Sequence, residues 1–106
     1  MAPARLRRVL EYIEAHLGEN VSLSELAEVA DLSLFHFAKL FKQSVGESPH
    51  QFVLRRRVER AKELLRNPEM SVLEASVRAG FADQRHFSKI FRRMVGASPS
   101  GCRLEG

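Results

Sequence analysis

Hydrophobic residues recur at helical spacing along this chain of 106 residues, and no stretch alternates apolar and polar residues as a β-strand does. The first segment places five apolar residues on one helical face, namely Leu6, Val9, Leu10, Ile13 and Leu17. Gly18 lies just past its end, where glycine suits the left-handed backbone that often follows a helix. The pattern predicts an all-α fold of about seven helices.

Capping signals predict two short helices. Ser22 stands three residues before Glu25, and Ser71 stands three residues before Glu74, which is the spacing of a capping box. We expect these helices to run to about residues 30 and 79. Ala27 and Ser76 supply the small side chains that a closely packed helix pair needs.

A second helix follows each short one, and the two second helices are copies of each other. Residues 36–41 (HFAKLF) return at 86–91 (HFSKIF), an offset of 50, and both copies run on to Gly-x-Ser-Pro. Ser33 and Asp83 are suited to cap helices over about 34–45 and 84–95. Their apolar faces are expected to comprise Phe37, Leu40, Phe41, Phe87, Ile90 and Phe91.

A longer helix is predicted between the two halves, from about residue 48 to residue 66. Ser48 and Pro49 start it, and Asn67-Pro68 stops it. Its apolar residues follow a 4-3-4 spacing: Leu54, Val58, Ala61 and Leu65. One domain, 1–106, is thus expected to hold two helix-turn-helix subdomains, 5–46 and 71–103, joined by this connecting helix. Ser98-Pro99 should begin a short, frayed last turn.

Charge and composition limit the classes of function that the chain could have. The net charge is +4 and the sequence pI about 9.8, which favours a polyanionic partner. The single cysteine permits no internal disulfide, and no apolar run could span a bilayer. The four histidines lack zinc-site spacing, and no phosphate loop or nucleophile elbow occurs. We therefore expect a cytoplasmic, soluble domain with no membrane association, no enzymatic activity, no metal and no cofactor.

A helix pair with a basic second helix is the arrangement that places a helix in the major groove of DNA. The connecting helix would span roughly 28 Å, close to the roughly 34 Å that separates successive major-groove faces. The second helices, about 34–45 and 84–95, are therefore predicted to enter adjacent major-groove segments of double-stranded DNA.

The chain resembles the DNA-binding domain of the AraC/XylS family of bacterial transcription regulators, from about Arg5 to Arg103. The matching motifs include Phe41-Lys42, Gly46-x-Ser48-Pro49, Gly80-Phe81-x-Asp83, Phe87-x-Lys89-x-Phe91 and Gly96-x-Ser98-Pro99. The resemblance implies seven helices and a monomer that binds an asymmetric site. It also implies action at the bacterial nucleoid, contact with RNA polymerase, and a fused N-terminal sensor or dimerisation domain outside this chain.

The chain departs from the family pattern at three places. Asp31 stands where the family usually has glycine, and Ala75-Ser76 where it usually has an Ile-Ala type pair. The closing Cys102-Arg103 lacks the aromatic residue that often precedes this arginine. These departures concern the packing of the units and the last helix.

Position on the second helices assigns candidate contacts. Base reading is predicted for residues near the helix starts and on their outward faces: Leu34, Phe35, Ala38, Lys39, Gln84, Arg85, Ser88 and Lys89. Phosphate contact is predicted for Ser33, His36, Lys42, Arg57, His86, Arg92 and Arg93. Phe35 could touch a thymine methyl or pack on the neighbouring turn. His36 and His86 could bind phosphate or serve a structural role, and the two lysines could simply be solvated.

The copies differ on their reading faces. Phe35 corresponds to Arg85, Leu34 to Gln84 and Ala38 to Ser88, which predicts two different half-sites rather than a palindrome. The second turn is also one residue longer than the first. The alternative function is a helical protein-interaction module without direct DNA reading, whose acidic residues Glu25, Glu28 and Asp31 would meet a basic partner.

Overall fold

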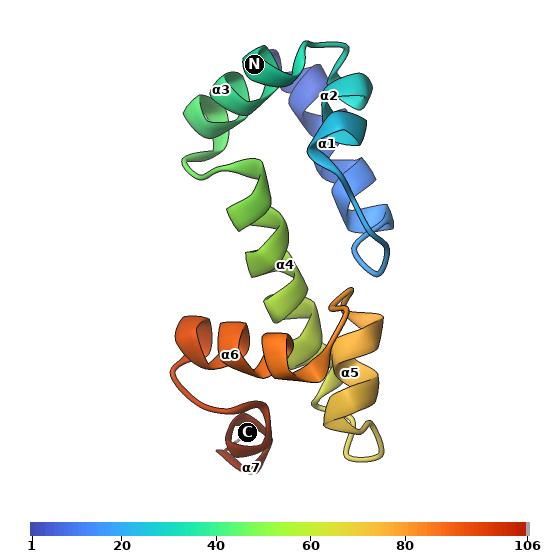
Figure 1. The fold of residues 1–106 in the computed structure, drawn as a ribbon, viewed down its shortest axis with the longest axis vertical. Helices are drawn as coiled ribbons and strands as arrows, with labels where there is room; N and C mark the ends of the chain where they lie inside the picture. The colour runs from blue at the N-terminus through green and yellow to red at the C-terminus, as the bar shows by residue number, and fades with distance from the viewer. Residues whose placement is uncertain (106) are drawn as a thin grey trace. The chain divides into compact units, whose positions relative to one another are not determined.

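The computed structural model describes the backbone of residues 1–105 and the side chains of residues 1–103. Within that range the chain forms seven α-helices and no strand (Figure 1), which confirms the all-α prediction. The helices are α1 (Pro3–Ala15), α2 (Leu23–Ala30), α3 (Leu34–Val45), α4 (Pro49–Leu64), α5 (Val72–Arg78), α6 (Gln84–Val95) and α7 (Pro99–Glu105). They group into two compact units, Met1–Leu54 and the chain from Arg55 onward, with α4 passing from the first into the second.

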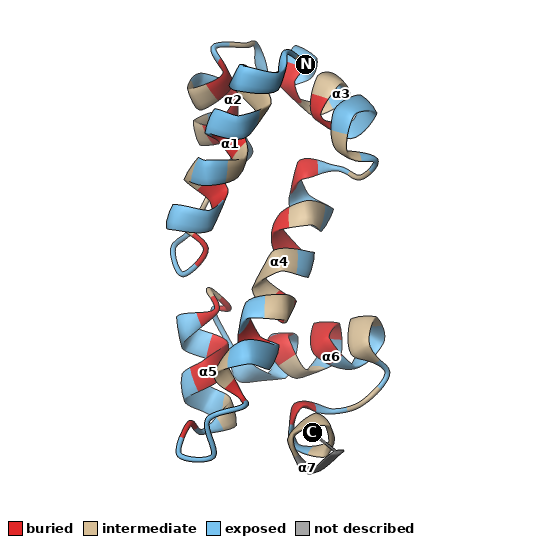
Figure 2. Cartoon of the chain, turned by 180° about the vertical axis from the view of Figure 1, so that it is seen from behind, coloured by how far each residue is buried: buried red, intermediate tan, exposed pale blue. Residues whose placement is uncertain are grey.

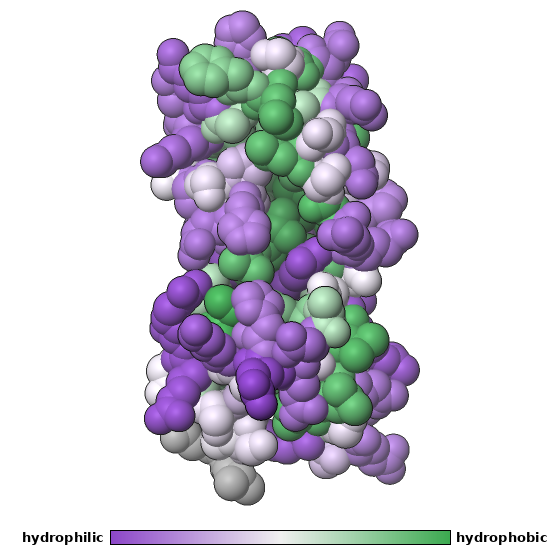
Figure 3. Space-filling view, in the orientation of Figure 1, coloured by the Kyte–Doolittle hydropathy of each residue, from purple (hydrophilic) through white to green (hydrophobic). Residues whose placement is uncertain are grey.

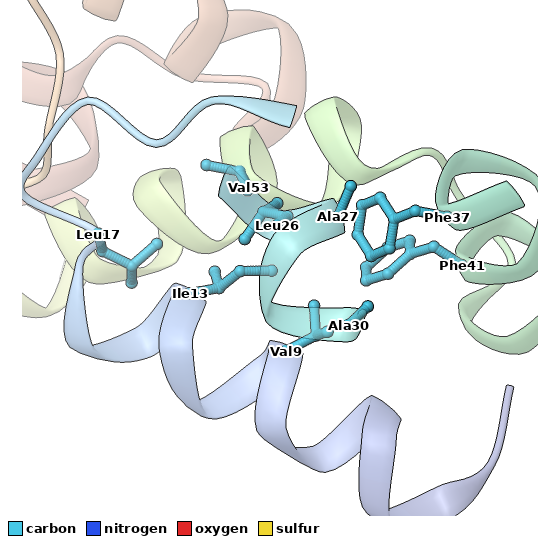
Figure 4. Packing of buried hydrophobic residues seen from close by; sticks show 9 residues of the cluster. All are labelled: Val9, Ile13, Leu17, Leu26, Ala27, Ala30, Phe37, Phe41 and Val53. Carbon is cyan, nitrogen blue, oxygen red and sulfur yellow. The ribbon is translucent and has the colours of Figure 1, made fainter. Parts of the chain in front are cut away.

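The first unit is held by one apolar core to which α1, α2, α3 and the start of α4 contribute (Figure 4). Phe37 and Phe41 of α3 are fully buried, and their ring centroids lie 5.6 Å apart in a tilted arrangement. Phe52 of α4 meets Phe41 edge-on at the same centroid distance of 5.6 Å. The remaining buried members are Val9, Ile13, Leu17, Leu26, Ala27, Ala30 and Val53.

The second unit repeats this aromatic arrangement. Phe87 of α6 is fully buried between Phe81 and Phe91, with ring centroids 5.0 Å and 5.5 Å away. Ala75 and Ser76 of α5 are fully buried, and the Ser76 hydroxyl donates to the carbonyl oxygen of Leu73 at 2.7 Å. The serine that departs from the family pattern is thus accommodated without an unpaired polar atom. Figure 2 shows the buried side of each helix.

The caps form as the sequence predicts. The Ser22 hydroxyl accepts a hydrogen bond from the backbone N–H of Glu25 at 3.1 Å, and Ser71 does the same for Glu74 at 3.0 Å. Ser33 and Asp83 cap α3 and α6. Each cap satisfies one of the backbone donors that a helix leaves unpaired in its first turn.

The two turns have the same hydrogen-bond pattern, which locates the extra residue. The N–H of Leu32 donates to the carbonyl of Ala27, and the N–H of Phe81 donates to the carbonyl of Ser76, both at 3.0 Å. Asp31 and Gly80 precede those donors, and both have positive φ, 56° and 100°. Asp31 therefore adopts the left-handed conformation that glycine adopts in the second turn. The additional residue of the second turn is Ala82, between this motif and the cap of α6.

Three helix ends differ from the expectation. Helix α4 ends at Leu64, two residues before the predicted end at residue 66. Helix α1 ends at Ala15, before Gly18, and at its end the backbone N–H of His16 donates to the carbonyl oxygens of Tyr12 and Ile13, while the His16 ring nitrogen Nδ1 lies 2.8 Å from the Tyr12 oxygen. The last segment is a seven-residue helix, α7, rather than a short turn. Its Arg103 donates to the carbonyl oxygens of Leu65, at 3.3 Å, and Met70. This arginine therefore ties α7 to the segment that follows α4.

Candidate DNA interface

Helix α3 separates its buried and exposed residues cleanly. Phe37 and Phe41 face the core, whereas Phe35 and Lys39 are exposed on the other side. Phe35 retains 73% of its surface, so it does not pack on the neighbouring turn as one of the two readings required. Leu34 is 48% exposed, which leaves two adjacent apolar side chains in water at the start of this helix. Isolated exposed apolar residues are ordinary, but such a pair is less so.

Helix α6 also has one buried and one exposed face, but the side chains at its exposed start are polar. Phe87, Ile90 and Phe91 are buried, while Gln84 and Arg85 are exposed at the helix start. At the remaining predicted base-reading positions, Lys89 is exposed and Ala38 and Ser88 are half-buried. Hydrogen-bond donors thus occupy the positions that Leu34 and Phe35 occupy on α3.

All but one of the residues predicted to contact phosphate are exposed. Ser33, His36, Lys42, His86, Arg92 and Arg93 are exposed. Arg57 of α4 is half-buried, and burial lowers the pKa of its guanidinium. Its neighbours Arg55 and Arg56 both bind the carboxylate of Glu59, with nitrogen–oxygen distances of 2.5 Å. The basic run of α4 is therefore partly engaged within the protein.

Sequence reasoning missed one residue on the outward face of α3. Gln43 is exposed and stands 50 positions before Arg93, which was predicted to contact phosphate. The repeat carries this signal, because Lys42 and Gln43 lie 50 positions before Arg92 and Arg93. Gln43 carries no charge, but its side-chain amide can donate to a phosphate oxygen.

The two histidines have structural contacts of different kinds. The His36 ring nitrogen Nδ1 lies 3.0 Å from the hydroxyl oxygen of Ser33, and its ring stands edge-on to Phe35 with centroids 6.0 Å apart. The His86 ring instead lies 6.2 Å from that of Phe81, centroid to centroid. Both remain exposed, so these contacts leave room for a ligand.

The acidic surface is smaller than the sequence suggested. Glu25 accepts a hydrogen bond from the Tyr12 hydroxyl at 2.9 Å, and this bond raises the pKa of Tyr12. Glu25 thereby joins α2 to α1 instead of facing solvent freely. Glu28 and Asp31 are exposed.

Nothing in the part of the chain with described side chains resembles a metal centre, since no three His, Cys, Asp or Glu residues lie close enough to hold an ion. A cavity of about 570 Å³ lies in the second unit, and none of its lining residues belongs to α6. No described helix is long and apolar enough to cross a membrane.

Each unit contains two packed helices, a tight turn between them, and an exposed face without acidic residues on the second helix. This is the helix-turn-helix class of protein, with two such units in one chain. The model of a helix-turn-helix domain family matches residues 26–105. The chain belongs to this family and to its AraC type, whose members are DNA-binding transcription regulators rather than enzymes.

Individual relatives agree with that assignment. The DNA-binding domain of the global transcriptional factor AdpA, solved with a target DNA, is 32% identical, with a TM-score of 0.90 over 95% of this chain and 91% of that one. The C-terminal domain of AraT, a response regulator from Geobacillus stearothermophilus, is 30% identical, with a TM-score of 0.91 over 99% of this chain and 87% of that one. The probable transcriptional regulator LumQ of Photobacterium leiognathi is 42% identical over 91% of this chain and 40% of its own length. The chain thus spans about two fifths of that curated relative.

Proposed function

We propose that this chain binds double-stranded DNA sequence-specifically and regulates transcription, with α3 and α6 inserted into adjacent major-groove segments. The observation that carries the proposal is the pair of capped helices, each anchored by buried phenylalanines and each exposing a face free of acidic residues. A helix anchored in this way presents a fixed set of side chains to base edges.

The proposed contacts divide into two groups. Leu34, Phe35, Ala38 and Lys39 on α3, together with Gln84, Arg85, Ser88 and Lys89 on α6, would face base edges. Ser33, His36, Lys42, His86, Arg92 and Arg93, with Arg57 on α4, would bind phosphates. Because the two base-reading sets differ, the DNA site would be asymmetric and the chain would bind in one direction.

Alanine substitution of Arg85 and Arg92 tests this division. Both side chains are exposed on α6, so neither change should disturb the core. Arg85→Ala is expected to relax the preference at one or two base pairs by about tenfold or more, because a bidentate base contact discriminates strongly. Arg92→Ala should weaken binding to all sequences alike. The test is to measure dissociation constants of both protein variants for a preferred duplex and for duplexes with single-base changes. The division would be contradicted if both proteins lost affinity without losing their preference among these duplexes.

A second candidate function is a protein-interaction role, which is compatible with DNA binding. It is favoured by Glu28 and Asp31, two exposed carboxylates in and after α2. RNA polymerase is the proposed partner, and a fused sensor or dimerisation domain is proposed for the whole protein. A regulator of this kind would work in the cytoplasm, at the bacterial nucleoid.

A further inference from the structure

We infer that the two halves of the DNA site are read by different chemistry, with α3 recognising thymine methyl groups by apolar contact and α6 recognising purines by hydrogen bonding. This inference rests on the proposed function and adds the base chemistry of each half-site. Both helices have the same length, 12 residues, and the same kind of cap. Their difference therefore lies in the side chains that they expose.

The apolar half of the inference follows from Leu34 and Phe35. These side chains are 48% and 73% exposed, and neither lies in the core cluster of the first unit. Neither can donate or accept a hydrogen bond, so neither can read the polar edge of a base pair. The one apolar feature on the major-groove edge of DNA is the C5 methyl group of thymine. Burying two water-exposed apolar side chains against such methyl groups would favour binding.

The His36 ring contacts the Phe35 ring at the start of α3. The contact between His36 Nδ1 and the Ser33 hydroxyl, 3.0 Å long, holds the imidazole against the cap of α3. The Phe35 ring stands edge-on to this imidazole, with centroids 6.0 Å apart. The contact leaves Phe35 73% exposed, so its ring is still available to a thymine methyl.

The polar half follows from Gln84 and Arg85, which occupy the equivalent places on α6 and are both exposed. Arginine pairs with the O6 and N7 atoms of guanine, and glutamine pairs with the N6 and N7 atoms of adenine. Neither of these pairings involves a methyl group. One half-site should consequently depend on thymine methyls and the other on purine N7 atoms.

Replacing thymine by uracil removes the methyl group and preserves base pairing, so it tests the apolar half directly. The probe is a duplex selected by this chain from a randomised pool, prepared with uracil in one half-site or in the other. We expect uracil to weaken binding about fourfold for each contacted methyl in one half-site, and to have little effect in the other. Replacing purines by 7-deazapurines should weaken binding chiefly in the second half-site.

Protein variants identify the helix responsible. Phe35→Ala should lower the uracil effect, and the double variant Leu34→Ala/Phe35→Ala should largely abolish it, whereas in Arg85→Ala it should persist at full size. Leu73→Ala is the matched control, because Leu73 is an apolar residue 55% exposed on α5, outside both reading helices. It should leave the uracil effect unchanged. Thermal unfolding of each variant verifies that the exposed substitutions leave the fold intact.

The outcomes separate this inference from the proposed function. If the chain binds no duplex at low salt, the proposed function is wrong and the inference fails with it. If it binds a selected duplex but uracil is neutral in both half-sites, only the inference is overturned. A uracil effect of equal size in both half-sites, or one that survives in the double variant Leu34→Ala/Phe35→Ala, would also overturn it.

Discussion

Replacing Phe37 by alanine is expected to lower the free energy of unfolding by about 3–5 kcal/mol, the usual cost of removing a buried phenylalanine ring. Phe37 is fully buried, lies in the core cluster of the first unit, and packs its ring against that of Phe41. A domain of this size is commonly stable by only about 5–15 kcal/mol. The loss should therefore be visible as a large shift of the midpoint in urea denaturation followed by circular dichroism.

Phe35→Ala provides the matched control for this prediction. Phe35 is the same residue type, two positions earlier on the same helix, but it is 73% exposed. Its removal is expected to change the free energy of unfolding by less than about 0.5 kcal/mol. The assignment of α3 as a helix with one buried and one reading face would be wrong if the two variants were destabilised equally.

Binding to duplex DNA is expected to weaken about a hundredfold between 50 and 200 mM salt. The estimate assumes about four phosphates neutralised, by Arg57, Lys42, Arg92 and Arg93, and a slope of about −0.9 per phosphate in a plot of log affinity against log salt. Fluorescence anisotropy with a labelled duplex over a salt series measures the slope. Arg92→Ala should reduce its magnitude by about one.

The salt series also distinguishes the two candidate functions. A module that binds only a basic protein partner does not bind DNA and therefore releases no cations from it. If the chain shows no duplex binding even at the lowest salt, the result favours the protein-interaction function. Glu28 and Asp31 then become the residues to test. A shallow slope with tight binding would contradict the assignment of the four cationic side chains to phosphates.

Local rules of helix formation account for the parts of the fold that the sequence predicts. The caps at Ser22, Ser33, Ser71 and Asp83 each depend on a side chain and a backbone N–H three residues apart, so sequence spacing determines them. The buried phenylalanine stripes are equally local, because helical periodicity decides which residues share a face.

The features that sequence reasoning placed poorly depend on contacts between distant residues. Helix α7 is tied by Arg103 to carbonyls more than thirty positions earlier, which no local pattern reveals. The bond between Glu25 and Tyr12 likewise joins two helices across 13 positions. The sequence alone does not decide the exposure of Phe35, because an apolar residue outside the buried face of a helix can either pack locally or remain in water. Figure 3 shows hydrophobic residues among hydrophilic ones on one face of the molecule.

We propose that α3 and α6 are two different reading helices built on one repeated scaffold. Selection of duplexes from a randomised pool by the intact chain, followed by sequencing, tests it most directly. We expect an enriched site with two unlike blocks about one helical turn apart, in a single orientation. An enriched palindrome, a single short block, or no enrichment at all would contradict it.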